Sequence, residues 1–224
     1  MVNIDTVYQR VLAFANKEQR GYITPQEFNL FAAQAQMEIF EQYFYDLNQY
    51  ARINNSDEEY SDILYSLNEK VGIFENTSSI SSNQVSATDF YKLGVVVSSG
   101  REVEEVQSDE ILYMNQSYLT KPTTNRPVYV RSGEKGVTTY PSGITATANY
   151  IRKPVTPKWG YFVVGNKALH DTSLSKTTHF ELHASEESEL VYKILKFAGI
   201  SMAKLDIMRA GQIQEQAQVQ QEKQ

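Results

Sequence analysis

The longest periodic stretch of the sequence constrains the fold more than any other feature. From Pro25 to about Ile53, apolar residues recur at the three- and four-residue spacing of an α-helix. They form two stripes: Phe28, Phe31, Ala35, Ile39, Tyr43, Leu47 and Tyr50 in one, and Leu30, Ala33, Met37, Phe40 and Phe44 in the other. A surface helix of a monomer needs only one apolar stripe. This helix should therefore be covered on two sides, by its own domain, by a neighbouring subunit, or by both.

The segment before this helix, Asn16–Phe28, resembles the second half of an EF-hand loop. With Gly21 at the glycine position of such a loop, Arg20 falls on a calcium-ligand position, and a guanidinium has no lone pair to give. A helix–turn–helix joint explains the same residues better. Thr24 is then the N-cap, a proline follows at the first helical position, and Glu27 closes a capping box. The pattern predicts a joint between helices and no calcium site.

Several further elements follow from local signals. Helices are expected over 3–18, from the capping box at 56–59 to about Gly72, and after Ser185, with a loop over 75–88 and a short helix near 108–114. The last long helix should bury Leu190, Val191, Ile194, Leu195 and Ala198. Strands are expected over 91–97, 101–106, 127–131, 136–140, 144–151, 159–164 and 178–182, with Ser98-Ser99-Gly100 as a hairpin turn.

This order of elements predicts an α+β fold. N-terminal helices and a C-terminal helix form a helical body, and an antiparallel β-rich subdomain is inserted between them. The expected divisions are 1–74 for the N-terminal helical part, 75–184 for the β-rich subdomain, and 185–224 for the C-terminal helix and a Gln-rich docking tail.

Composition excludes several classes of protein. The chain has 224 residues, a net charge of −6 and no cysteine, which excludes disulfides, thiolate zinc sites and cysteine nucleophiles. There is no signal-peptide pattern and no stretch approaching the ~20 apolar residues of a membrane span. The sequence has no Lys/Arg cluster of the kind that a free nucleic-acid binder usually shows. The 15 tyrosines fit either a Tyr-rich core or a protein interface.

Catalytic and metal-binding patterns are weak. The sequence His179-Phe180-Glu181-Leu182-His183 is not the HExxH zinc motif, because Glu stands two residues after the first histidine. On a strand its three polar residues would share one face, and a solvent-facing row is the commoner arrangement. There is no GxSxG, Walker or GxGxxG motif. We therefore predict no catalytic, cofactor-binding or metal-ligating residues, no cofactor, and no enzymatic activity.

Several segments resemble structural proteins of tailed bacteriophages, especially the crAss-like group. They are RGYITPQEFNLFAAQAQMEIFEQYFYDLNQY, DFYKLGVVV, EVEEVQSDEILYMNQSYL, NYIRKPVTPKWGYFVV and FELHASEESELVYKILKFAGIS, and they span about Gly21 to Ser201. Such proteins act as head-to-tail adaptor or neck rings below the portal, commonly twelve-fold. Their fold is similar: a helical body interrupted by a β-rich subdomain, with a C-terminal segment that reaches a neighbour.

The resemblance implies a virion structural protein of the neck or tail, assembled in the bacterial host cytoplasm. Its implied partners are copies of itself, the portal, other neck and tail proteins, and viral DNA that passes without sequence-specific binding, with no membrane involved. The residue pattern adds expected interface residues: Leu30, Met37, Phe40 and Phe44 on the long helix, and Ile213 and Val219 in the Gln-rich tail 212–224. A soluble enzyme with an unrecognised acidic site and a non-viral oligomeric scaffold remain the alternatives.

Overall fold

The computed structural model divides the chain into two compact units, which we describe separately. One unit comprises Met1–Ile73 and Pro154–Gln224, and the other is Phe74–Lys153. The structure describes residues 1–17, 23–52, 58–165, 167–173, 176–201, 213–214 and 216–217. Helices and an antiparallel-dominated sheet occupy different parts of the chain, which confirms the α+β class.

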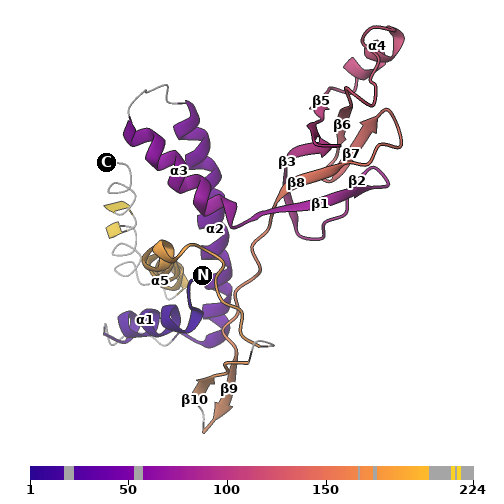
Figure 1. Ribbon diagram of the computed structural model, residues 1–224. Helices are drawn as coiled ribbons and strands as arrows, with labels where there is room; N and C mark the ends of the chain where they lie inside the picture. The colour runs from indigo at the N-terminus through magenta and orange to yellow at the C-terminus, as the bar shows by residue number, and fades with distance from the viewer. Residues whose placement is uncertain are drawn as a thin grey trace. The chain divides into compact units, whose positions relative to one another are not determined.

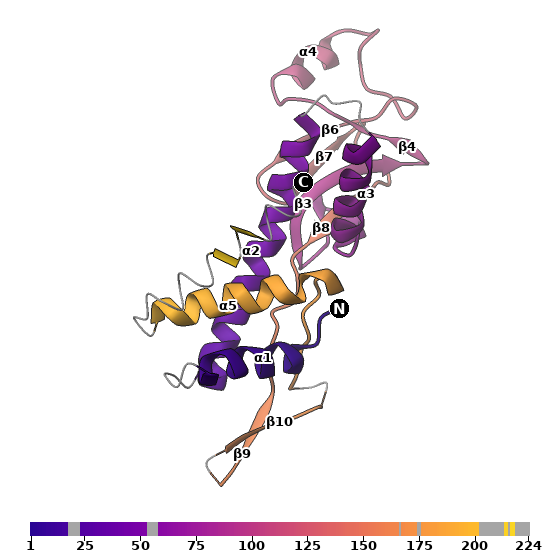
Figure 2. The same cartoon turned by 90° about the vertical axis from the view of Figure 1, so that its left-hand side faces the viewer.

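In its described residues the first unit has four long helices: α1 (Ile4–Lys17), α2 (Pro25–Arg52), α3 (Glu58–Gly72) and α5 (Glu187–Ser201). Helix α5 packs against both α1 and α2, and α3 packs against α2 (Figures 1 and 2). The two apolar stripes of α2 are therefore both used, at least in part, within the chain's own helical unit. The five residues expected on the buried face of α5 are all buried.

The start of α2 is fixed by the predicted capping box. The Thr24 N–H and hydroxyl donate to the Glu27 carboxylate at 2.9 and 2.8 Å, and the Glu27 N–H donates to Thr24 Oγ1 at 3.3 Å. These bonds satisfy donors that the first helical turn would otherwise leave unpaired. They also hold the pKa of Glu27 below its ordinary value, the Thr24 backbone N–H having the larger effect. The turn prediction is thus confirmed at its helical end, while residues 18–22 lie outside the described part of the chain.

The second unit is an eight-stranded sheet in the order β4-β3-β8-β1-β2-β7-β6-β5. All neighbouring strands are antiparallel except β5 and β6. The strands are β1 (Glu75–Ser81), β2 (Gln84–Val85), β3 (Phe90–Ser98), β4 (Arg101–Glu102), β5 (Glu104–Glu105), β6 (Val128–Ser132), β7 (Gly136–Tyr140) and β8 (Thr147–Arg152), with α4 (Glu110–Gln116) between β5 and β6.

Two tight turns define the hairpins of this sheet. The expected turn between β3 and β4 is present, with Ser99 and Gly100 at φ 50° and 75° and Ser98 paired to Arg101. Two central residues at positive φ are typical of the type I′ turn, whose twist matches that of paired strands. Ser82 and Asn83, at φ 51° and 59°, make the same kind of turn between β1 and β2.

Three expectations differ from the structure. Residues 75–88 were expected to be a loop, but 75–81 and 84–85 are strands, because β8 pairs with residues 75–79 and the end of β1 pairs with β2. Residues 178–182 were expected to be a strand, but they make only isolated bridges, from Thr178 to Lys158 and from Phe180 to Val2. The segment 154–184, expected in the β-rich part, belongs to the helical unit.

Candidate functional site

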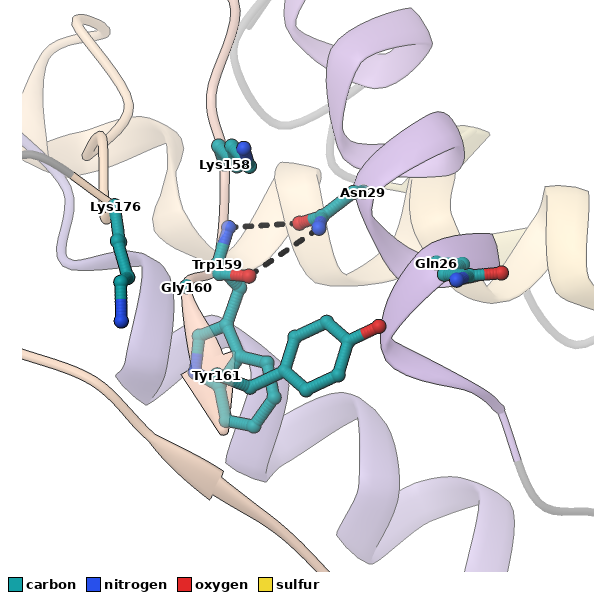
Figure 3. Close-up of a pocket in the computed structure, with 7 residues that line it drawn as sticks. All are labelled: Gln26, Asn29, Lys158, Trp159, Gly160, Tyr161 and Lys176. Atoms are coloured by element: carbon teal, nitrogen blue, oxygen red, sulfur yellow. Dashed lines mark hydrogen bonds between the residues drawn. The ribbon is translucent and has the colours of Figure 1, made fainter. Parts of the chain in front are cut away.

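A buried tryptophan ties the segment after β8 to the helices of the first unit. Trp159 is 1% exposed, and its backbone is clasped by the side chain of Asn29 on α2. The Trp159 N–H donates to Asn29 Oδ1 at 2.7 Å, and Asn29 Nδ2 donates to the Trp159 carbonyl at 3.2 Å (Figure 3). The indole N–H donates to Asp5 Oδ1 of α1 at 2.9 Å. One residue thereby fixes this segment to two helices.

Aromatic rings surround the indole. Its neighbours are Tyr8 at 4.1 Å, His170 at 5.6 Å and Tyr161 at 5.8 Å between ring centroids, and the last two are stacked. Offset or stacked aromatic pairs contribute beyond their buried area. Because Tyr161 and His170 stand opposite each other on β9 (Tyr161–Val164) and β10 (Lys167–His170), the cluster holds both strands at their base.

A second set of bonds closes the same base. The Gly160 N–H donates to Thr177 Oγ1 at 3.2 Å, and the Asp171 N–H donates to the Gly160 carbonyl at 2.9 Å. A Cβ at Gly160 would stand 2.6 Å from that Thr177 oxygen, so only glycine fits here. Lys176 pairs with Asp171 at 2.8 Å, and hydrogen bonds from Lys176 and then Ser173 lower the pKa of Asp171 to about 2.

A small open cavity of about 340 Å³ lies beside this anchor. Its lining, shown in Figure 3, consists of Gln26, Asn29, Lys158, Trp159, Gly160, Tyr161 and Lys176. The lining offers amides, lysine ammonium groups and an aromatic wall, but neither a carboxylate nor an imidazole. It therefore lacks the imidazole and carboxylate groups that general acid–base catalysis most often uses.

The β9–β10 hairpin extends away from the helices of its unit in both views (Figures 1 and 2). Within the described residues these two strands pair only with each other. Phe162 pairs with Leu169 and Val164 with Lys167, so these four side chains share one face, which we call the hairpin face. Its three apolar members are 45–56% exposed. An isolated two-stranded hairpin is marginally stable, and here the Trp159 anchor supports one that displays apolar groups to the outside.

The second unit also exposes apolar side chains, around α4. Ile111 is buried, and Met114 packs with it against β6, which directs Leu112 and Tyr113 outward. Leu112 and Tyr113 are 63% and 71% exposed, and Tyr118 and Leu119 just beyond the helix exceed 90%. Exposed apolar clusters of this kind mark interaction surfaces more often than isolated exposed residues do.

The predicted interface residues are spread over different environments. Leu30 is 71% exposed, whereas Phe40 is fully buried inside its own unit with its ring 5.0 Å from that of Phe44. Met37 and Phe44 are half-buried. Ile213 is 66% exposed, and Val219, like most of the tail 212–224, lies outside the described residues. Their role in an interface stays a prediction. Phe40 belongs to the buried core of its own unit.

The histidine-rich segment 179–183 is committed to structural bonds. His179 Nδ1 accepts the Ile4 N–H at 3.3 Å, the Glu181 carboxylate accepts the Val155 N–H at 2.8 Å, and His183 caps the turn that precedes α5. In the described part of the chain, no three His, Cys, Asp or Glu side chains gather as a metal site would need. Nor does any helix there combine the length and apolar character required to cross a membrane.

Sequence analysis identified β9 but not the hairpin as a surface. The missed signal is the dipeptide Gly165-Asn166, a sequence typical of hairpin turns, which follows the strand-like run Tyr161–Val164. The exposed tyrosine and leucine after α4 carry no such signal, since only the packing of Ile111 shows which side of α4 faces out. In comparisons with known proteins, no family model matches the chain and no curated protein is recognisably similar to it.

Proposed function

We propose that the chain is a structural protein of a tailed-bacteriophage neck, of the crAss-like type, which forms a ring between portal and tail. In this role it has no catalytic activity and lines the channel through which DNA passes. It assembles in the bacterial cytoplasm and resides in the virion. The proposal combines the resemblance of about Gly21 to Ser201 with the surface chemistry of the folded chain.

The observation that carries the proposal is the hairpin face. The chain uses a buried tryptophan, an asparagine clasp and a closed base to hold a two-stranded hairpin that is apolar on its outside. Exposed apolar groups of this kind mark interaction surfaces and promote aggregation when they stay uncovered. A ring subunit needs two different surfaces, because every head-to-tail contact joins one face to another.

The overall charge also fits a channel. With a net charge of −6, the chain gains little from neutralising phosphates. Neutralisation by lysine and arginine releases counterions and holds DNA in place. A channel lining without that attraction lets the DNA duplex slide through.

Cryo-electron microscopy of virions that contain this chain would test the proposal. The expected result is a closed ring between portal and tail, with density in each subunit for the four helices α1, α2, α3 and α5. Particles purified with the chain present but without ring density at the head–tail junction would refute it, as would location of the chain elsewhere in the particle.

A further inference from the structure

The hairpin face combines apolar side chains with positive charge. Phe162, Val164 and Leu169 surround Lys167, whose side chain is also exposed. The enclosing segment 158–176 contains three lysines and one aspartate, a net charge of +2 in a chain whose total is −6. A complementary partner for this face offers apolar side chains together with carboxylates.

The second unit exposes both apolar and acidic side chains on and next to α4, and we call this set the α4 patch. It consists of Asp109, Glu110, Leu112, Tyr113, Tyr118 and Leu119, all exposed. Glu110 and Tyr113 are three residues apart on α4 and therefore lie on the same side of the helix. The sequence from Glu102 to Leu119 contains five carboxylates and neither lysine nor arginine.

We propose that the hairpin face of one copy of the chain docks on the α4 patch of a second copy. The charges favour this pairing over the symmetric ones: two hairpin faces would oppose lysine to lysine, and two α4 patches would oppose carboxylates, both of which are repulsive. A contact between two different surfaces repeats from copy to copy and can close into a ring. The inference rests on the proposed function and names the contact that builds the ring.

Charge reversal tests the contact directly. Lys167→Glu makes the hairpin face negative, and Glu110→Lys makes the α4 patch less negative. Each variant alone should associate at least tenfold more weakly than the wild-type chain. Sedimentation velocity and native mass spectrometry at low ionic strength measure this association. Glu134→Lys, the same charge change at the exposed turn between β6 and β7, is the matched control and should associate as the wild type does.

Mixing the two single variants gives the sharpest outcome. In the mixture, the negative hairpin face of one variant meets the altered patch of the other, and the unchanged surfaces meet each other. Association should therefore return, with the variants alternating and each oligomer containing equal numbers of the two. Phe162→Ser should abolish association of the wild-type chain, and should abolish association of the mixture when both charge variants carry it. A helical circular dichroism signal equal to that of the wild type shows that the Phe162→Ser chain is folded.

Three results would overturn the inference. The wild-type chain could remain monomeric at every concentration, the single variants could associate as well as the wild type, or the mixture could fail to associate while the double variant Lys167→Glu/Glu110→Lys does. The last result would place the contact within one chain. A neck ring seen by microscopy with other contacts would sink this inference alone, whereas absence of the ring would sink the proposed function.

Discussion

Removal of the Asn29 side chain should destabilise the helical unit strongly. In Asn29→Ala, the Trp159 N–H and carbonyl both lose their partner, and both belong to a residue that is 1% exposed. An unsatisfied buried backbone group costs roughly 1–3 kcal/mol. The adjoining cavity can admit water to these two groups, which reduces the penalty. We therefore expect Asn29→Ala to lower the free energy of unfolding by about 3 kcal/mol, in the lower half of the range for two such groups.

Trp159 is the only tryptophan of the chain, so its fluorescence reports on this site without labelling. Urea unfolding followed at that signal should show the midpoint lowered by about 1.5 M, if m is about 2 kcal/mol/M. Asn48→Ala is the matched control: Asn48 lies on the same helix, but its side chain is exposed and donates to the Phe44 carbonyl one turn away. That change should stay within about 0.5 kcal/mol. An Asn29→Ala midpoint as close to the wild type as that of the control would refute the clasp.

Three further predictions test other parts of the structure. Thr24→Ala removes the cap of α2 and should cost about 1 kcal/mol in urea unfolding; an unchanged midpoint would contradict the capping box. Phe40→Ala should cost about 3–5 kcal/mol because Phe40 is fully buried, whereas Leu30→Ala should stay within about 0.5 kcal/mol; equal effects would show that the burial is misassigned. Burial, and then the hydrogen bond to Glu105, raise the pKa of Tyr129 to about 12. The neutral phenol therefore stabilises the folded state fully below pH 10, and this stabilisation is lost as the pH rises towards 12. Alkaline difference spectra of the wild type against Tyr129→Phe measure the pKa of Tyr129, and ionisation of this residue near pH 10 would contradict the prediction.

Sequence reasoning succeeded where the determinants are local. The capping box at Thr24, the apolar period of α2 and α5, and the turn at Ser99-Gly100 all depend on residues within a few positions of one another. Each was predicted with its residues, and each is present. The α+β class followed because the helical and strand-like periods occupy separate stretches.

Sequence reasoning failed where a distant partner strand determines whether a segment becomes a strand. The Ser/Asn/Thr-rich segment 75–81 has a loop-like composition, yet it forms a strand because β8, about seventy residues later, pairs with residues 75–79. Conversely, Thr178–Leu182 has strand-like residues but no continuous partner. The same limit applies to the candidate site: the hairpin face and the α4 patch are defined by which side chains packing leaves outside, which the order of residues alone does not show.

The position of α5 has a consequence for how the chain is made. Helices α1 and α2 are synthesised first, but their apolar faces are closed by α5, about 140 residues after α2 ends. The sheet of 74–153 is continuous in sequence and can fold as soon as it leaves the ribosome, whereas the helical unit must wait for nearly the whole chain. A prematurely terminated chain therefore keeps its N-terminal helices uncovered and is exposed to proteases. The helical unit therefore completes its packing only after α5 has been made.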